Sequence, residues 1–111
     1  MIDNSAQAMR LMSKLEATLP VFARLSPELA AVVRKESPAL ELPERCRVNR
    51  IDYAGDEGGI VCWLDLGDRD RTQKFIASIT HLIFDRTQPL AREITAYQKH
   101  RIKRLKRSSP H

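Results

Sequence analysis

The first part of the chain has the apolar periodicity of two α-helices. After a candidate N-cap in Asp3–Ser5, apolar residues recur at steps of three and four as far as Leu19, where Pro20 interrupts the pattern. A second helix is predicted to begin at Ser26-Pro27, because a serine cap precedes a proline at the first helical position. It ends before Pro38, and an extended connector with two prolines follows.

The middle of the chain has the composition of a β-hairpin. Arg45–Ala54 and Ile60–Leu66 are rich in β-branched and aromatic residues, and the three glycines of Gly55–Gly59 favour a turn between them. The simplest register pairs Asp52 with Cys62, which divides the apolar residues between two faces. One face then carries Val48, Ile60, Cys62, Leu64 and Leu66. The other carries Ile51, Tyr53, Val61 and Trp63. Because both faces are apolar, we expect both to be covered.

Two further helices are predicted after the hairpin. Asp70 and Gln73 form a plausible capping box for the third helix. Its apolar face consists of Phe75, Ile76, Ile79, Leu82 and Ile83. The fourth helix runs from Leu90 to about Arg107, and residues 107–111 are expected to form a frayed tail.

The predicted fold is a single small α+β domain over residues 1–111. Its order is α-α-β-β-α-α, with helices packed on a two-stranded antiparallel hairpin. A lone hairpin is only marginally stable in water and has two open edges. We therefore expect the helices to cover it or a second copy of the chain to pair with it, which predicts a homo-oligomer.

The positive charge is concentrated at the end of the chain. Residues 87–111 sum to +6 and residues 1–86 to −1, which gives the net charge of +5. On a helical wheel the basic residues lie opposite an apolar stripe, except for Arg101, which falls beside Ile94 and Leu105. The basic residues proposed to bind nucleic acid are Lys99, Arg101, Lys103, Arg104, Lys106 and Arg107.

This basic helix has three interpretations. It is a solvated face whose cations complement the helix dipole, or a contact that neutralises nucleic-acid phosphates, or a helix that binds a membrane surface or an acidic partner. The membrane interpretation is weakened because the apolar face has neither Trp nor Phe. A helix-turn-helix is disfavoured, because the charges lie far from the N-terminal residues that read bases.

The hairpin face with Ile51, Tyr53, Val61 and Trp63 has two interpretations. Either a helix of the same chain buries it, or two copies meet there, since Trp and Tyr are enriched at the centres of interfaces. These four residues are the candidate interface.

Other chemistry has weaker support. Cys62 and His81, with Asp65 or Asp85, resemble a nucleophile and base, but Cys62 lies within an apolar run and more simply packs in the core. The acidic residues around the hairpin lack the spacing of a calcium loop. These are Asp52, Asp56, Glu57, Asp65, Asp68 and Asp70.

The sequence therefore predicts a non-enzymatic binding module without a metal or cofactor. It has no signal-peptide pattern, no apolar run long enough to cross a bilayer and only two cysteines, so we expect a cytoplasmic protein without membrane contact. Nucleic acid is the first candidate partner. The alternative is a homo-oligomeric structural or protein-adaptor domain whose basic helix is only a solvated face.

Overall fold

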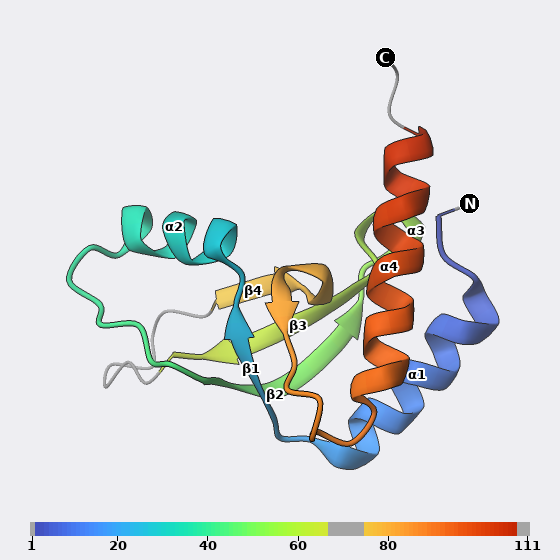
Figure 1. The fold of residues 1–111 in the computed structure, drawn as a ribbon, viewed down its shortest axis with the longest axis horizontal. Coiled ribbons are helices and arrows are strands. Elements are labelled where there is room, and N and C mark those ends of the chain that lie inside the picture. The colour runs from blue at the N-terminus through green and yellow to red at the C-terminus, as the bar shows by residue number, and fades with distance from the viewer. Residues whose placement is uncertain (1, 67–74, 109–111) are drawn as a thin grey trace.

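The computed structural model describes residues 2–66 and 75–108 (Figure 1). Within these ranges the helices are α1 (Ser5–Thr18), α2 (Pro27–Glu36), the single turn α3 (Gly55–Gly58), the 3₁₀ helix η1 (Ile79–His81) and α4 (Ala91–Ser108). The strands are β1 (Val21–Leu25), β2 (Cys46–Tyr53), β3 (Ile60–Asp65), β4 (Phe75–Ser78) and β5 (Leu82–Ile83). The protein is α+β, but its element order and its sheet differ from the sequence prediction.

The five strands form one antiparallel sheet with the order β4-β3-β2-β1-β5. The hairpin of β2 and β3 lies at its centre. β4 pairs with β3 along one edge, and the chain then passes through η1 so that β5 reaches the opposite edge beside β1. The predicted two-stranded hairpin with α-α-β-β-α-α order is therefore wrong.

Two segments account for this error. Val21–Leu25, which lies between the first two predicted helices, is strand β1. Phe75–Ile83, expected to be part of a helix, forms β4, η1 and β5. Short apolar runs of this kind fit a buried helix or a strand equally well, and here pairing with β3 and with β1 decides for strand.

The register of the central hairpin also differs from the prediction. The pairing shifts between Val48 and Arg50, so Asp52 lies opposite Val61 and Ile51 lies opposite Cys62. Since a shift of one residue exchanges the two faces of a strand, the candidate interface is divided. Ile51 and Tyr53 share the inner face with Ile60 and Cys62, whereas Val61 and Trp63 lie on the outer face.

The inner face of the sheet holds the core. α1 packs against β2 and against α4, and these two helices lie side by side in Figure 1. α2 contributes Val33 to the same core. The largest fully buried side chains are Leu15, Cys46, Val48, Ile60, Cys62, Ile79, Ile94 and Tyr97.

The beginnings of the first two long helices follow from capping. The Asn4 side chain accepts a hydrogen bond from the Gln7 backbone N–H, and the Ser26 hydroxyl accepts one from the Leu29 backbone N–H. The capping box at Asp70 and Gln73 lies outside the described residues, as does the end of the predicted frayed tail. Within residues 2–66 and 75–108, no helix has the length and hydropathy needed to cross a membrane.

Candidate nucleic-acid interface on the C-terminal helix

α4 packs on the core with its first three turns and then extends beyond it. Its buried side chains are Ala91, Ile94, Tyr97 and Arg101, at steps of three, three and four residues. From Ile102 to Arg107 every side chain is exposed, including the apolar Ile102 and Leu105. Figure 1 shows the C-terminal end of α4 projecting from the rest of the molecule.

Five of the six basic residues predicted to bind nucleic acid are exposed on this helix: Lys99, Lys103, Arg104, Lys106 and Arg107. Within the described part of the chain, Lys99, Lys103, Lys106 and Arg107 form no ion pair with an acidic side chain. Their charges are therefore not neutralised by carboxylates of the described fold.

Arg101 is different, because the structure buries it. Its guanidinium donates hydrogen bonds to Asp3 Oδ1 at 3.0 Å, to the Asp56 carbonyl at 2.8 Å and to the Glu57 carbonyl. The side chains of Arg101 and Asp3 are only 3% and 1% exposed. Arg101 is thus committed to the fold and is not available at the surface. The wheel position among apolar residues was the sequence signal for this burial.

Asp3 is the centre of a hydrogen-bonded cluster that sequence reasoning missed. The hydroxyls of Tyr53 and Tyr97 each donate to Asp3 Oδ2 at 2.8 Å. Tyr97 also accepts a hydrogen bond from the Ile60 backbone N–H. Burial and, to a smaller extent, the hydrogen bond to Asp3 raise the pKa of both tyrosines, that of Tyr53 to about 12. The cluster joins the two ends of the chain to the β2–β3 connection.

Asp56 completes this cluster at the start of the chain. Its carboxylate accepts hydrogen bonds from the backbone N–H groups of Ile2 and Asp3 at 2.7–2.9 Å. These bonds lower the pKa of Asp56, because they stabilise the charged form. Asp56, one of the acidic residues around the hairpin, therefore has a structural role, because it holds the backbone at the start of the chain. Among the described residues no group of three potential ligands converges on a metal position; Asp68 and Asp70 lie outside them.

A cationic groove lies at the beginning of α4. It has a volume of about 470 Å³ and is lined by Phe84, Arg86, Ala91, Arg92, Thr95, Ala96 and Lys99. Three of these side chains are cationic, one is aromatic and none is acidic. The two nearest acids in the sequence are engaged elsewhere: Glu93 pairs with Lys14 at 2.9 Å, and Asp85 pairs with Arg45 at 3.8 Å.

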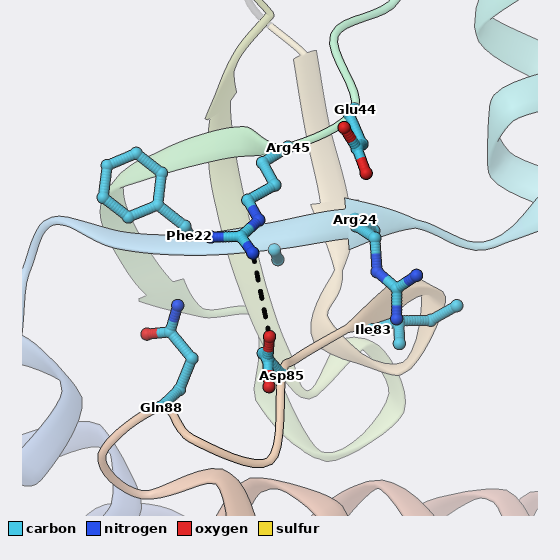
Figure 2. A pocket seen from close by; sticks show the side chains of 8 residues that line it. Phe22, Arg24, Glu44, Arg45, Ile83, Asp85 and Gln88 are labelled. Carbon is cyan, nitrogen blue, oxygen red and sulfur yellow. Dashed lines mark ion pairs between the residues drawn. The ribbon is translucent and has the colours of Figure 1, made fainter.

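A second, smaller pocket of about 160 Å³ lies at the outer side of β1 (Figure 2). Arg45 and Asp85 approach each other across it, and Glu44 and Arg24 lie at its border. Its charges are mixed and partly paired. It therefore has no clear preference for an anion or a cation.

The outer face of the sheet carries the remaining half of the candidate interface. The Trp63 indole donates to Asp52 Oδ2 at 2.7 Å, and the Arg50 guanidinium lies 4.7 Å from the centre of its ring. Trp63 and Val61 are half-buried, not enclosed. The strand pairings place Phe22 and Ile76 on this same face, and both are exposed.

The candidate nucleophile does not have the environment of a reactive thiol. Cys62 is buried on the inner face of the sheet, and burial raises its pKa to about 12. His81, considered as its base, lies in η1 with an exposed side chain. Cys46 is buried as well, and its thiol donates to the Ala23 carbonyl at 3.2 Å.

Comparison with protein-family models, with curated proteins and with solved structures finds no match. The described residues define an α+β protein with a five-stranded antiparallel sheet and with α1 and α4 packed side by side on the core; α4 is cationic and extends beyond the core.

Proposed function

We propose that this protein is a non-enzymatic module that binds nucleic acid through the cationic face of α4. The residues that contact phosphates are Lys99, Lys103, Arg104, Lys106 and Arg107, all of them exposed. The observation that carries the proposal is the projection of this helix beyond the core, with four of these cations unpaired within the described fold. Arg101, predicted from the sequence as a sixth contact, is excluded because it is buried against Asp3.

The spacing of the cations fits a polyanionic strand. Arg92, Lys99, Lys103 and Lys106 follow one another at steps of seven, four and three residues, which puts them on one side of a helix. At a rise of about 1.5 Å per residue this stripe is about 21 Å long. Several phosphates of one strand lie within that length, since they are a few ångströms apart.

The contact is expected to be electrostatic and independent of sequence. If three to five of these side chains neutralise phosphates of a duplex, the logarithm of the association constant falls with the logarithm of the salt concentration with a slope of roughly −3 to −4.5. Binding is measured by fluorescence anisotropy with a labelled DNA duplex over a salt series. Equal affinity for duplexes of unrelated sequence is the second expected result.

A quadruple variant tests the helix directly. Changing Lys103, Arg104, Lys106 and Arg107 to glutamine removes four exposed charges from the end of α4 without touching a buried side chain. We expect this variant to lose binding and to keep the far-UV circular dichroism and the unfolding midpoint of the wild type.

A control variant removes the same charge elsewhere. Arg10, Arg34, Lys35 and Arg47 are equally exposed but lie on α1, α2 and β2. Their replacement by glutamine is expected to weaken binding much less. If both quadruple variants lose affinity equally, only net charge matters and the α4 interface is wrong. Absence of any binding by the wild type at low salt would overturn the proposal as a whole.

A second function is favoured by the outer face of the sheet. Phe22 and Ile76 are 44% and 51% exposed there; Ile76 lies beside the half-buried Trp63, whereas Phe22 lies opposite Arg47. Apolar side chains gathered on a sheet face are typical of a protein interface. Self-association or adaptor binding through this face is therefore the alternative function. Val61 and Trp63, two of the four residues of the predicted interface, belong to this face. Ile51 and Tyr53 belong to the inner face and are no longer included.

Sedimentation distinguishes this alternative from a monomer. A dimer through the outer face is expected to dissociate when Ile76 is changed to lysine, because a charge then lies in the apolar contact. A wild type that sediments as a monomer at high concentration would contradict self-association.

A further inference from the structure

We propose that the groove beside Phe84 binds one nucleotide of a single strand, with the base against the Phe84 ring and the phosphate among Arg86, Arg92 and Lys99. This inference rests on the proposed function and deepens it, because it names the form of nucleic acid that the protein prefers.

The shape of the groove suits a planar group. Ala91, Thr95 and Ala96 line it with small side chains, so that the first turns of α4 leave space instead of filling it. Phe84 is half-buried and packs against the core, which holds its ring beside this space. The volume of about 470 Å³ lies within the range of about 300–1,000 Å³ that is usual for small-molecule sites.

The charge of the groove selects an anion. Arg86, Arg92 and Lys99 line it, and no carboxylate does. Asp85 is directed to Arg45 and to the Thr87 backbone N–H, and Glu93 is directed to Lys14. A phosphate in the groove therefore meets three cations without a competing negative charge.

The combination of an aromatic ring and three cations identifies the ligand as a nucleotide with an accessible base. Bases stack on aromatic side chains when they are free of a duplex, and the contact tolerates any base because each has a π-face. Duplex bases are already stacked and paired, so they have no free face for Phe84. The groove therefore predicts a preference for single strands that the cations of α4 alone do not explain.

The groove is continuous with the rest of the proposed interface. Lys99 lines it and also belongs to the cationic stripe that continues through Lys103 and Lys106. A strand with one nucleotide in the groove can thus run along α4 with its following phosphates on these lysines. This continuity favours a polynucleotide over a free mononucleotide.

The test compares a short labelled oligothymidylate with a DNA duplex of equal length, both measured by fluorescence anisotropy. The wild type is expected to bind the single strand more tightly. Phe84→Leu keeps an apolar side chain against the core but removes the π-face. Since a stacked base contributes about five-fold or more to affinity, this variant is expected to weaken binding of the oligothymidylate by at least that factor and to leave duplex binding unchanged.

Two further variants provide a control for the loss of an aromatic ring and an independent test of the groove. Phe22→Leu removes an exposed ring from the outer face of the sheet and is expected to change neither affinity. Ala96→Glu puts a carboxylate into the groove at an exposed helical position and is expected to weaken single-strand binding without lowering the unfolding midpoint. If Phe84→Leu proves to be unstable, the affinity of Ala96→Glu for the single strand tests the groove proposal in its place.

The outcomes separate this inference from the proposed function. If Phe84→Leu and Ala96→Glu bind oligothymidylate as tightly as the wild type, or if duplex is preferred, the groove proposal is overturned while the α4 interface stands. If the groove variants lose single-strand binding but the quadruple α4 variant retains it, the groove is confirmed and the α4 interface is wrong. If the wild type binds neither probe, both are overturned.

Discussion

The guanidinium of Arg101 lies 3.0 Å from the carboxylate of Asp3, across 98 positions of the sequence. Both side chains are buried. Within the described residues, each of their buried nitrogen and oxygen atoms has a hydrogen-bond partner. The pair joins the start of the chain to the last helix at the point where α4 leaves the core. It therefore fixes the direction in which the exposed cationic turns project.

Arg101→Met is expected to destabilise the protein by about 3–5 kcal/mol, because it leaves the Asp3 carboxylate buried without its countercharge. The measurement is urea unfolding followed by circular dichroism. Lys103→Met, an exposed change two residues away, is the control and is expected to alter stability by no more than about 0.5 kcal/mol. Equal stability of the two variants would show that the buried pair is not formed in solution.

The double variant of Asp3→Asn with Arg101→Met tests the pairing itself. When Arg101 has been replaced, Asp3→Asn also removes the buried negative charge that would otherwise have no countercharge. We expect the free-energy cost of the double variant to be smaller than the sum of the two single costs. Strict additivity would mean that the two residues do not interact.

Gly59→Ala is expected to be more damaging than Gly55→Ala, although both glycines have positive φ angles. Gly59 has φ +66° and ψ −156°, a conformation that is essentially restricted to glycine. An added Cβ would lie 2.7 Å from Arg101 Cζ and 2.8 Å from the Tyr97 hydroxyl oxygen. At Gly55, with φ +80°, an added Cβ would meet nothing within 4 Å.

Thermal unfolding of the two glycine variants gives the comparison. Gly55→Ala reports the backbone strain alone, about 1–2 kcal/mol, whereas Gly59→Ala adds displacement of the Arg101–Asp3 cluster. A Gly59 variant no less stable than the Gly55 variant would contradict the close approach at Gly59.

Asp56 is expected to make stability fall in acid. Its folded-state pKa is below the ordinary 3.8, so its contribution is fully present above that pH and is lost as the pH falls through the lower folded value. Asp56→Asn is expected to be less stable than the wild type at neutral pH, and this difference should shrink below about pH 4. The measurement is the unfolding midpoint over a pH series.

The control for Asp56 is Glu57→Gln. Glu57 is exposed, and its carboxylate makes no hydrogen bond with the described residues. Its removal is expected to leave the pH dependence unchanged. A constant difference between wild type and Asp56→Asn at all pH values would argue against the hydrogen bonds to Ile2 and Asp3.

Neither cysteine is expected to react with a thiol reagent in the native protein. Burial raises the pKa of Cys46 to about 11 and that of Cys62 to about 12, so the thiolate is scarce at neutral pH and the sulfur is also inaccessible. In denaturant both are expected to react at the rate of free cysteine. Rapid modification of the folded protein would contradict this burial, and modification of Cys62 would favour a catalytic role for its thiol.

Much of the helical structure was predictable because its signals are local. Ser26 and Pro27 mark the beginning of α2 by capping and by the fixed φ of proline, and both act within a few residues. The apolar stripe and the cationic face of α4 follow from helical periodicity in the same way. Even the unusual position of Arg101 was visible on the wheel, although its partner was not.

The sequence by itself determined the long helices, the central strands and the concentration of charge at the C-terminal end, because capping, periodicity and composition depend on neighbouring residues. Only the tertiary structure decided that Val21–Leu25, Phe75–Ser78 and Leu82–Ile83 pair as strands and that the β2 register shifts after Val48. The fold also selected Asp3 as the partner of Arg101. Each of these depends on residues distant in sequence, and short apolar segments gain their hydrogen bonds and their buried face only from the strands beside them.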